Sequence, residues 1–317
     1  MIDELVRRAG EDDEEAIDEL VAIADAEPER LAPHHLRMLE LDVIYPPKLY
    51  RKAGDDVVRR IVEQVDGGQP GGRLNHLLVA LAHSGHPLAE EALRRWAEAP
   101  APGWEELFVG ALSYAREGGW TVDPDGRRRA LCGDVAYEWL LRQAPVRADR
   151  GTCPWCASPL WTAAELDTAD ADVAAALAHT GWSGRLTLET CHFCSCYTTL
   201  FSRVTPDGGA AWWDGNVRPG YIGKTDEPEE PPALLPVVGP ARPTPFQASA
   251  WEDGGSTLGG QPEWIQDATH PDCPGCGLAM AYVGLIGGSD LDEYGEGAYY
   301  LHVHEPCGFA AVNYQQS

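Results

Sequence analysis

Hydrophobic residues in the first part of the chain recur with the period of an α-helix. In residues 12–26, the residues Ile17, Leu20, Val21 and Ala24 form one apolar stripe, and acidic side chains lie opposite. The same pattern recurs in five further short segments, which cover residues 33–44, 55–65, 73–85, 86–99 and 104–119. Glycine and proline separate these segments, so we expect several short amphipathic helices.

These helices follow one another at near-regular intervals over residues 1–147. The pair in residues 77–99 resembles a helical hairpin of the HEAT type. The sequence therefore predicts an α-helical N-terminal domain over 1–147, either a small HEAT-like solenoid or an irregular bundle.

The pattern changes after about residue 148, where tryptophan, glycine, proline, threonine and tyrosine become frequent. Strand-like segments cover residues 185–190, 197–204, 281–287 and 298–304. One helix is expected over 162–181, and the proline-rich stretch 226–246 is predicted to be an extended connection. We therefore expect an α+β fold in which two β-rich halves, 148–225 and 247–317, follow the helical domain.

The nine cysteines are arranged in a way that favours metal sites over disulfides. Cys153 and Cys156 form one C-x-x-C pair, and Cys191 and Cys194 form a second. Two thiolates of one such turn can reach a single zinc ion at about 2.3 Å, so two turns complete a tetrahedron. The 34 residues between the pairs exceed the gap of a common zinc ribbon. The helix expected over 162–181 accounts for the excess.

Two alternatives remain open at this first site. Cys196 can replace Cys194 as the fourth ligand, although the C-x-x-C spacing favours Cys194. The pair of Cys153 and Cys156 can also be a redox dithiol. Such pairs normally open a helix after a strand, whereas a Ser-Pro sequence follows closely here, so the sequence favours zinc.

The third C-x-x-C pair, Cys273 and Cys276, has only one cysteine downstream, Cys307. His304 precedes Cys307 with the same spacing, an imidazole in place of a thiolate. These four residues are therefore predicted to form a closed Cys₃His site, which is typical of structural zinc because no position is left for water. His302 lies too far back for the tight turn. The alternative is that both histidines are ordinary strand residues and that Cys307 is a free, buried thiol.

Charge narrows the range of partners. The chain has 50 Asp and Glu residues against 24 Lys and Arg residues, a formal net charge of −26. Phosphate backbones repel such a chain, so we expect no nucleic-acid partner. A nucleic-acid-binding zinc ribbon would need a basic patch, for which the candidates are Arg142, Arg147, Arg150, Arg185 and Arg203. A basic protein partner fits the charge better.

The sequence shows no sign of membrane association. No apolar run reaches the roughly 18 residues of a membrane span. The opening MIDELVRRAG is acidic and lacks the apolar core of a signal peptide. We therefore expect a soluble cytoplasmic protein.

A set of residues in the C-terminal part carries a family resemblance: Gly259-Gly260, Pro262, Trp264-Ile265-Gln266, Cys273-Pro274-x-Cys276-Gly277, Met280 and the strand entry over 295–300. Together with the CPWC and CHFCSC segments before them, they make residues 150–317 similar to the YwqG-like bacterial domains of unknown function. The resemblance implies a β-rich fold and, because some members lie near polymorphic toxin genes, an immunity role by association. It supplies no catalytic residues, and its last cysteine turn tends to be C-x-x-C, where this chain has H-x-x-C.

Two functional hypotheses follow. The first is a zinc-stabilised binding protein, in its most specific form an acidic immunity-type protein that neutralises a cationic partner. The alternative is an enzyme whose active site lies between the two β-rich halves, with an unidentified reaction and unknown catalytic residues. A pocket with convergent polar groups of perturbed pKa would favour the enzyme, and an acidic helical face would favour the binding protein.

Overall fold

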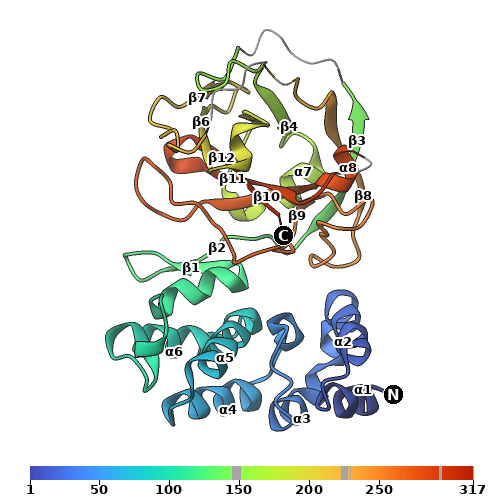
Figure 1. The fold of residues 1–317 in the computed structure, drawn as a ribbon, viewed down its shortest axis with the longest axis vertical. Helices are drawn as coiled ribbons and strands as arrows, with labels where there is room; N and C mark the ends of the chain where they lie inside the picture. Colours follow the sequence, from blue (N-terminus) through green and yellow to red (C-terminus); the bar gives the residue numbers. More distant parts are fainter. Residues whose placement is uncertain (145–150, 223–227, 229, 293–294, 317) are drawn as a thin grey trace. The chain divides into compact units, whose positions relative to one another are not determined.

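The computed structural model describes residues 1–144, 151–222, 228, 230–292 and 295–316 (Figure 1). The chain divides into two compact units, Met1–Arg129 and Ala130–Ser317. The first is built mainly from helices and the second mainly from strands, so the predicted α+β class is confirmed. Among the described residues, no helix has both the length and the apolar character that crossing a membrane requires.

The helical unit contains α1 (Ile2–Ala9), α2 (Glu14–Ala26), α3 (His35–Glu40), α4 (Asp55–Asp66), α5 (Gly71–Ser84) and α6 (Pro87–Glu98). Its 3₁₀ helices are η1 (Pro28–Arg30), η2 (Ala32–His34), η3 (Pro47–Tyr50), η4 (Trp104–Glu106) and η5 (Ala111–Gly118). A two-stranded sheet of β1 (Trp120–Val122) and β2 (Arg128–Ala130) follows. Local signals set several helix ends: Asp13 caps α2 by accepting a hydrogen bond from Ala16 N over 3.2 Å. Gly85, with φ of +62°, ends α5.

Residues of the predicted apolar stripes form much of the core of the helical unit, although Ile17 and Val21 are only partly buried, and residues between the predicted segments complete it. Its largest fully buried side chains are those of Leu20, Leu31, Leu49, Tyr50, Ile61, Leu74 and Trp96 together with Met38. Helix α5 is buried along most of its length, as expected for a helix that is apolar on several sides.

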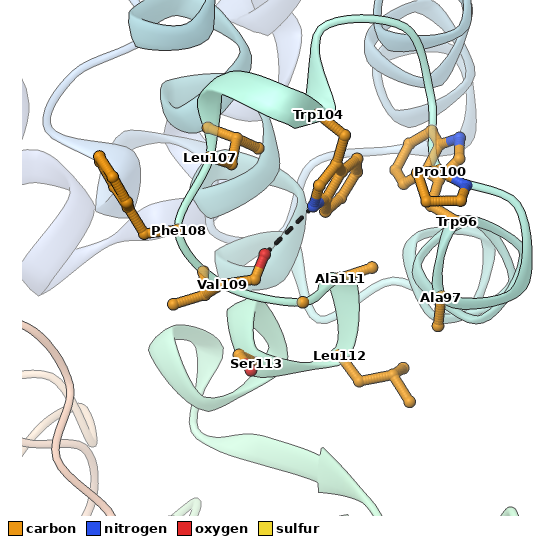
Figure 2. A pocket seen from close by; sticks show the side chains of 11 residues that line it. Trp96, Ala97, Pro100, Trp104, Leu107, Phe108, Val109, Ala111, Leu112 and Ser113 are labelled. Carbon is orange, nitrogen blue, oxygen red and sulfur yellow. Dashed lines mark hydrogen bonds between the residues drawn. The ribbon is translucent and has the colours of Figure 1, made fainter.

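The segment 104–119 departs from the continuous helix that its sequence predicts. It forms η4 and η5, and the irregular residues 107–110 separate them. Gly103 precedes η4 with a φ of +92°, a value outside the helical region. Trp104 Nε1 donates a hydrogen bond to Val109 O over 3.1 Å and holds the irregular turn. Beside this turn the surface has a hollow of about 370 Å³, lined mostly by apolar side chains (Figure 2).

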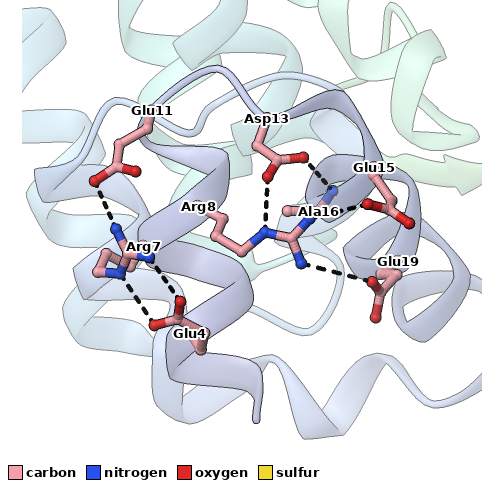
Figure 3. A network of polar contacts seen from close by, with 8 residues as sticks. All are labelled: Glu4, Arg7, Arg8, Glu11, Asp13, Glu15, Ala16 and Glu19. Carbon is pink, nitrogen blue, oxygen red and sulfur yellow. Dashed lines mark hydrogen bonds and ion pairs between the residues drawn. The ribbon is translucent and has the colours of Figure 1, made fainter.

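Helices α1 and α2 form an acidic end of the helical unit. Residues 1–19 contain nine Asp and Glu residues and two arginines, a net charge of −7. Figure 3 shows that carboxylates surround both arginines. Arg7 contacts Glu4 and Glu11 at 2.6 Å each, and Arg8 contacts three further carboxylates, the nearest at 2.7 Å. Exposed ion pairs of this kind contribute little to stability, so the main consequence is a surface that stays negative.

The β unit is organised around one eight-stranded antiparallel sheet of order β7-β6-β12-β11-β10-β9-β3-β8. Its strands are β3 (Ala136–Gln143), β6 (Leu200–Val204), β7 (Ala210–Trp212), β8 (Leu234–Ala241), β9 (Thr257–Gly259), β10 (Ala281–Gly287), β11 (Ala298–His304) and β12 (Phe309–Gln315). A second sheet pairs β4 (Trp161–Asp167) with β5 (Arg185–Thr190). The short helices are α7 (Ala171–Ala176), η7 (Ala178–Thr180), η8 (Cys194–Cys196), α8 (Gly288–Leu291) and η9 (Glu305–Cys307).

The structure divides the chain differently from the sequence-based prediction. Because β3 pairs with β8 and β9, the β unit begins at Ala130, before the predicted boundary at 147/148. That boundary and the one at 225/226 themselves lie outside the described residues. The predicted connection 226–246 contains β8, an edge strand in which Pro236 is tolerated. The two predicted β-rich halves share one sheet, since β6 of the first pairs with β12 of the second.

The helix expected over 162–181 is also corrected. Its first part is strand β4, and only α7 and η7 are helical. Alanine-rich sequence has a high helix propensity, but Ala163 and Ala164 are completely buried in the core of the β unit. Pairing with β5 and this burial outweigh the local preference.

Candidate metal centres

The first cluster consists of Cys153, Cys156, Cys191 and Cys194. The first two lie in a turn just before β4, and the other two follow β5 directly. Trp161, at the start of β4, pairs with Thr190, at the end of β5. Both cysteine turns therefore lie at the same end of the two-stranded sheet, although 34 residues separate them in the sequence.

The sulfur atoms of the first cluster are spaced like the ligands of one tetrahedral ion. The Sγ atoms of Cys153 and Cys194 are 3.8 Å apart, and those of Cys156 and Cys191 are 3.5 Å apart. Ligands at the corners of a tetrahedron lie about 3.8 Å apart when the metal–sulfur distance is about 2.3 Å. All four side chains are buried, the most exposed at 7%. The first cluster can therefore hold a metal ion away from water.

Electrostatics make a cation favourable in the first cluster. Side-chain contacts with Cys191 and Cys194 lower the pKa of the Cys153 thiol, and the contact with Cys153 raises the pKa of Cys191. The ionisation of one buried thiol thus opposes that of its neighbours. A bound cation removes this conflict because it lets several thiolates share one positive centre.

Cys196 lies outside the first cluster. Its exposed thiol contacts Tyr299 Oη and His192 O, each at 3.4 Å. The residues after Cys153 form a turn, closed by a hydrogen bond of 2.9 Å from Ala157 N to Cys153 O, and not the opening of a helix. The geometry expected of a redox C-x-x-C pair is therefore not the geometry of this turn.

The second cluster consists of Cys273, Cys276, His304 and Cys307. The first two lie in a turn before β10, His304 is the last residue of β11, and Cys307 ends η9. Strand β10 begins at Ala281, which pairs with Val303 near the end of β11. The turns of the second cluster therefore meet at one end of the large sheet.

The second cluster is less buried than the first. Cys273 and His304 are buried, Cys307 is partly exposed and Cys276 is exposed. The sulfur of Cys276 lies 3.8 Å from His304 Nε2. A Cβ atom on Gly275 would lie 3.2 Å from the sulfur of Cys307, so glycine makes room for that ligand. Four protein donors around one ion leave no open position, which is typical of structural sites.

His302 shares β11 with His304 but lies in the interior, outside the second cluster. Its ring stacks on that of Trp264 at 6.3 Å between centroids and meets His270 edge-on at 5.6 Å. Burial holds the pKa of His302 well below its usual value. Sequence reasoning missed this neighbourhood, in which Cys132 Sγ lies 3.9 Å from His270 Nε2. No motif links residues so far apart in the chain.

A repeated order of elements builds the two clusters. Each has a cysteine turn, a strand, a helix, a strand and a second ligand turn: β4, α7, β5 and η8 in one, β10, α8, β11 and η9 in the other. The first turns also repeat their hydrogen bonds. Cys153 N donates to the carbonyl of residue 158, and Cys273 N to that of residue 278, both over 2.8 Å. The shared Cys-Pro-x-Cys motif was the available sequence signal for this repeat.

Comparison with known proteins gives one similarity. The chain is 31% identical over 294 residues to the Salmonella typhimurium protein YpfL, which is described as uncharacterized. The match covers 88% of the chain and 66% of YpfL, so the chain spans just under two thirds of that relative's length. No model of a known protein family matches the chain, and no solved structure matches it.

Proposed function

We propose that this chain is a zinc-stabilised interaction protein that binds a cationic protein partner. One structural zinc ion in each cluster holds the turns of the β unit together, and the acidic surface of the chain attracts the partner. The zinc part of the proposal is carried by one observation: eight donor atoms gather in two separate groups of four, each within 4.8 Å.

Zinc fits these donors better than other common metals. Thiolate and imidazole donors select zinc or iron–sulfur centres, whereas magnesium and calcium require oxygen ligands. The sulfur separations of 3.5 and 3.8 Å in the first cluster match a single tetrahedral ion. Because the proposal makes seven of the nine cysteines metal-bound thiolates, we also infer a reducing compartment, the cytoplasm.

Charge supports a cationic partner. Residues 1–129 contain 26 acidic and 16 basic residues, and residues 130–317 contain 24 and 8, so the net charges are −10 and −16. Each unit alone would repel nucleic acid and attract a basic protein. The acidic end formed by α1 and α2 concentrates this charge on the helical unit.

An immunity-type role is the most specific form of this proposal. It rests on the resemblance of residues 150–317 to YwqG-like domains and on the acidity of the chain. HEAT-like packing of the short helices, which we also propose, would give the helical unit a surface suited to protein binding. The hollow in Figure 2 is lined by apolar groups, which suits a protein contact better than acid–base catalysis.

Elemental analysis tests the zinc part. Full-length protein purified without added metal should contain two zinc ions per chain. A content of one would remove one cluster from the proposal, and the absence of zinc, or a different metal at full occupancy, would remove both.

Reconstitution tests the partner part. A partner identified by affinity capture from the source organism should be produced separately and its binding to the full chain measured at low and physiological salt. We expect a basic partner whose affinity falls as salt rises, because exposed charge interactions are screened. A neutral or acidic partner, or an affinity independent of salt, would contradict the charge argument.

A further inference from the structure

We propose that the hollow beside η4 and η5 is the docking surface for this partner. Its occupant is a polypeptide segment that places an aromatic or branched aliphatic side chain in the hollow and lysine or arginine at the rim. The proposal rests on the proposed function in taking the partner to be cationic. It adds the place of contact and an apolar anchor, neither of which net charge can specify.

The floor of the hollow is apolar and firmly held. Trp96 is 2% exposed, and its Nε1 donates a hydrogen bond of 2.9 Å to Asp66. The ring centroids of Trp104 and Trp96 are 6.2 Å apart, and Trp104 Nε1 donates a hydrogen bond to Val109 O. Since both indole N–H groups already have acceptors inside the protein, the rings offer an entering group their apolar surfaces.

The rim carries apolar side chains that face water. Phe108 has a relative exposure of 103%, and Val109 of 47%. Figure 2 shows Phe108 pointing away from the turn that Trp104 holds. Binding of a partner that covers both the phenylalanine and the hollow is favourable, because it removes apolar surface from water. Buried aromatic anchors of this kind supply much of the affinity of protein interfaces.

The stretch of chain that forms most of the lining carries charges of one sign, and the neighbouring Arg95, 5.5 Å from the centroid of the Trp96 ring, is paired with Asp66 at 2.7 Å. Residues 97–115, which include most of its lining, contain three glutamates and no lysine, arginine or histidine. Glu98 and Glu105 are exposed, while Glu106 accepts a hydrogen bond of 2.8 Å from Gly71 N. A segment with cationic residues on either side of an apolar anchor complements this arrangement. The glutamates would repel an anionic segment, and a purely apolar segment would form no ion pair with them.

Selection of short random peptides on the full chain tests the proposal. We expect the enriched peptides to combine aromatic or aliphatic residues with lysine and arginine. Their affinity should fall at least about tenfold in Phe108→Ser, the loss typical of an anchor residue. It should fall less in the double variant Glu98→Gln/Glu105→Gln, which should also show a weaker dependence on salt.

Matched variants control for general effects. Val217→Ser removes another strongly exposed apolar side chain, and Glu29→Gln/Glu40→Gln removes two exposed acids of the helical unit that lie outside the acidic end formed by α1 and α2. Both should leave peptide affinity within about twofold of wild type, because surface changes away from a contact have small effects. Zinc content and unfolding midpoint should stay unchanged in every variant, which shows that binding and not folding is affected.

The outcomes separate this surface from the proposed function. If the enriched peptides are cationic but bind Phe108→Ser as tightly as wild type, the hollow is not the docking surface. The proposal of a cationic partner would still stand. Enriched peptides without an excess of lysine and arginine, or no enrichment at all, would overturn both.

Discussion

The two clusters repeat one plan with different surroundings. Both use a Cys-Pro-x-Cys turn before a strand and a second turn after the partner strand. The first cluster is fully buried and all-cysteine, and it lies at one end of the small β4–β5 sheet. The second cluster has one exposed and one partly exposed cysteine and takes a histidine as its fourth member. It sits at the end of β10 and β11, which are central strands of the large sheet.

This difference in surroundings indicates how much each cluster contributes to holding its own strands together. Strands β10 and β11 have neighbours on both sides in an eight-stranded sheet, so pairing supports them without a metal. Strands β4 and β5 form a sheet of two, which is marginal without further support. With zinc bound, four thiolates would leave the first cluster a net charge of −2, and His304 would reduce that of the second to −1. We therefore expect the first cluster to matter more for folding and the second to exchange its metal more readily.

The largest effect should follow the loss of a ligand from the first cluster. Cys194→Ser should reduce zinc content from two to one and strongly destabilise the region around β4 and β5. The scale is set by the apparent binding free energy of structural zinc, about 10–16 kcal/mol in small zinc-finger peptides. Elemental analysis and hydrogen exchange over residues 151–204 would measure the two losses.

Cys196→Ser is the matched control, two residues away and exposed. It should retain two zinc ions and the stability of wild type within about 0.5 kcal/mol. If instead Cys196→Ser loses zinc and Cys194→Ser keeps it, the ligand assignment at this turn is wrong.

The second-largest effect should follow His304→Ala, with His302→Ala as its control. His304→Ala should remove zinc from the second cluster, or leave binding that water completes. His302→Ala should keep two zinc ions. It should still destabilise the protein, by about 2–5 kcal/mol, because His302 is completely buried in the core. Stability alone therefore cannot identify the ligand, and zinc content must be measured. Zinc loss in His302→Ala alone would reverse the assignment.

A smaller effect should appear in the order of metal loss. A chelator reaches the second cluster through the exposed Cys276, whereas the four sulfurs of the first cluster are covered. We expect two phases of zinc release from the wild-type protein, and the fast phase should be the one that His304→Ala lacks. Release monitored with a zinc-sensitive dye would show both phases. A fast phase that survives in His304→Ala but disappears in Cys194→Ser would contradict the comparison drawn from burial.

The sequence was most informative where ligand spacing is local. A C-x-x-C turn places two sulfurs on one ion by its own geometry, so the grouping of Cys153 with Cys156 and of Cys273 with Cys276 needed no knowledge of the fold. The H-x-x-C spacing singled out His304 in the same way. The apolar stripes of the helical unit were readable for a similar reason, because helical periodicity is a local property.

The sequence was least informative where long-range pairing decides the structure. Strand β3 belongs to the β unit because it pairs with β8 and β9, whose residues are far away in the chain. Strand β4 is a strand because β5 and the core hold its alanines, against their helix propensity. The irregular turn at 107–110 is held by the hydrogen bond from Trp104, and the hollow lies beside this turn. No sequence motif predicts either feature.

The smallest effect concerns one backbone position that the two clusters share. Ala157 and Gly277 each follow the second cysteine of the first turn, with φ of +63° and +75°. Glycine adopts this region freely, whereas alanine is strained there by about 1–2 kcal/mol. Gly277→Ala should therefore lower the free energy of unfolding by about 1 kcal/mol, since the added Cβ meets no atom within 4 Å and only the backbone strain counts.

Ala157→Gly should act in the opposite direction and by less. It relieves the strain, but glycine also gives the unfolded chain more freedom, which offsets part of the gain, so an increase of about 0.5 kcal/mol is expected. Both variants should keep two zinc ions, and urea unfolding of the zinc-bound proteins would measure the two changes. If both substitutions change the free energy of unfolding in the same direction, the two turns are not equivalent. The repeat would then not include the backbone conformation of the cysteine turns.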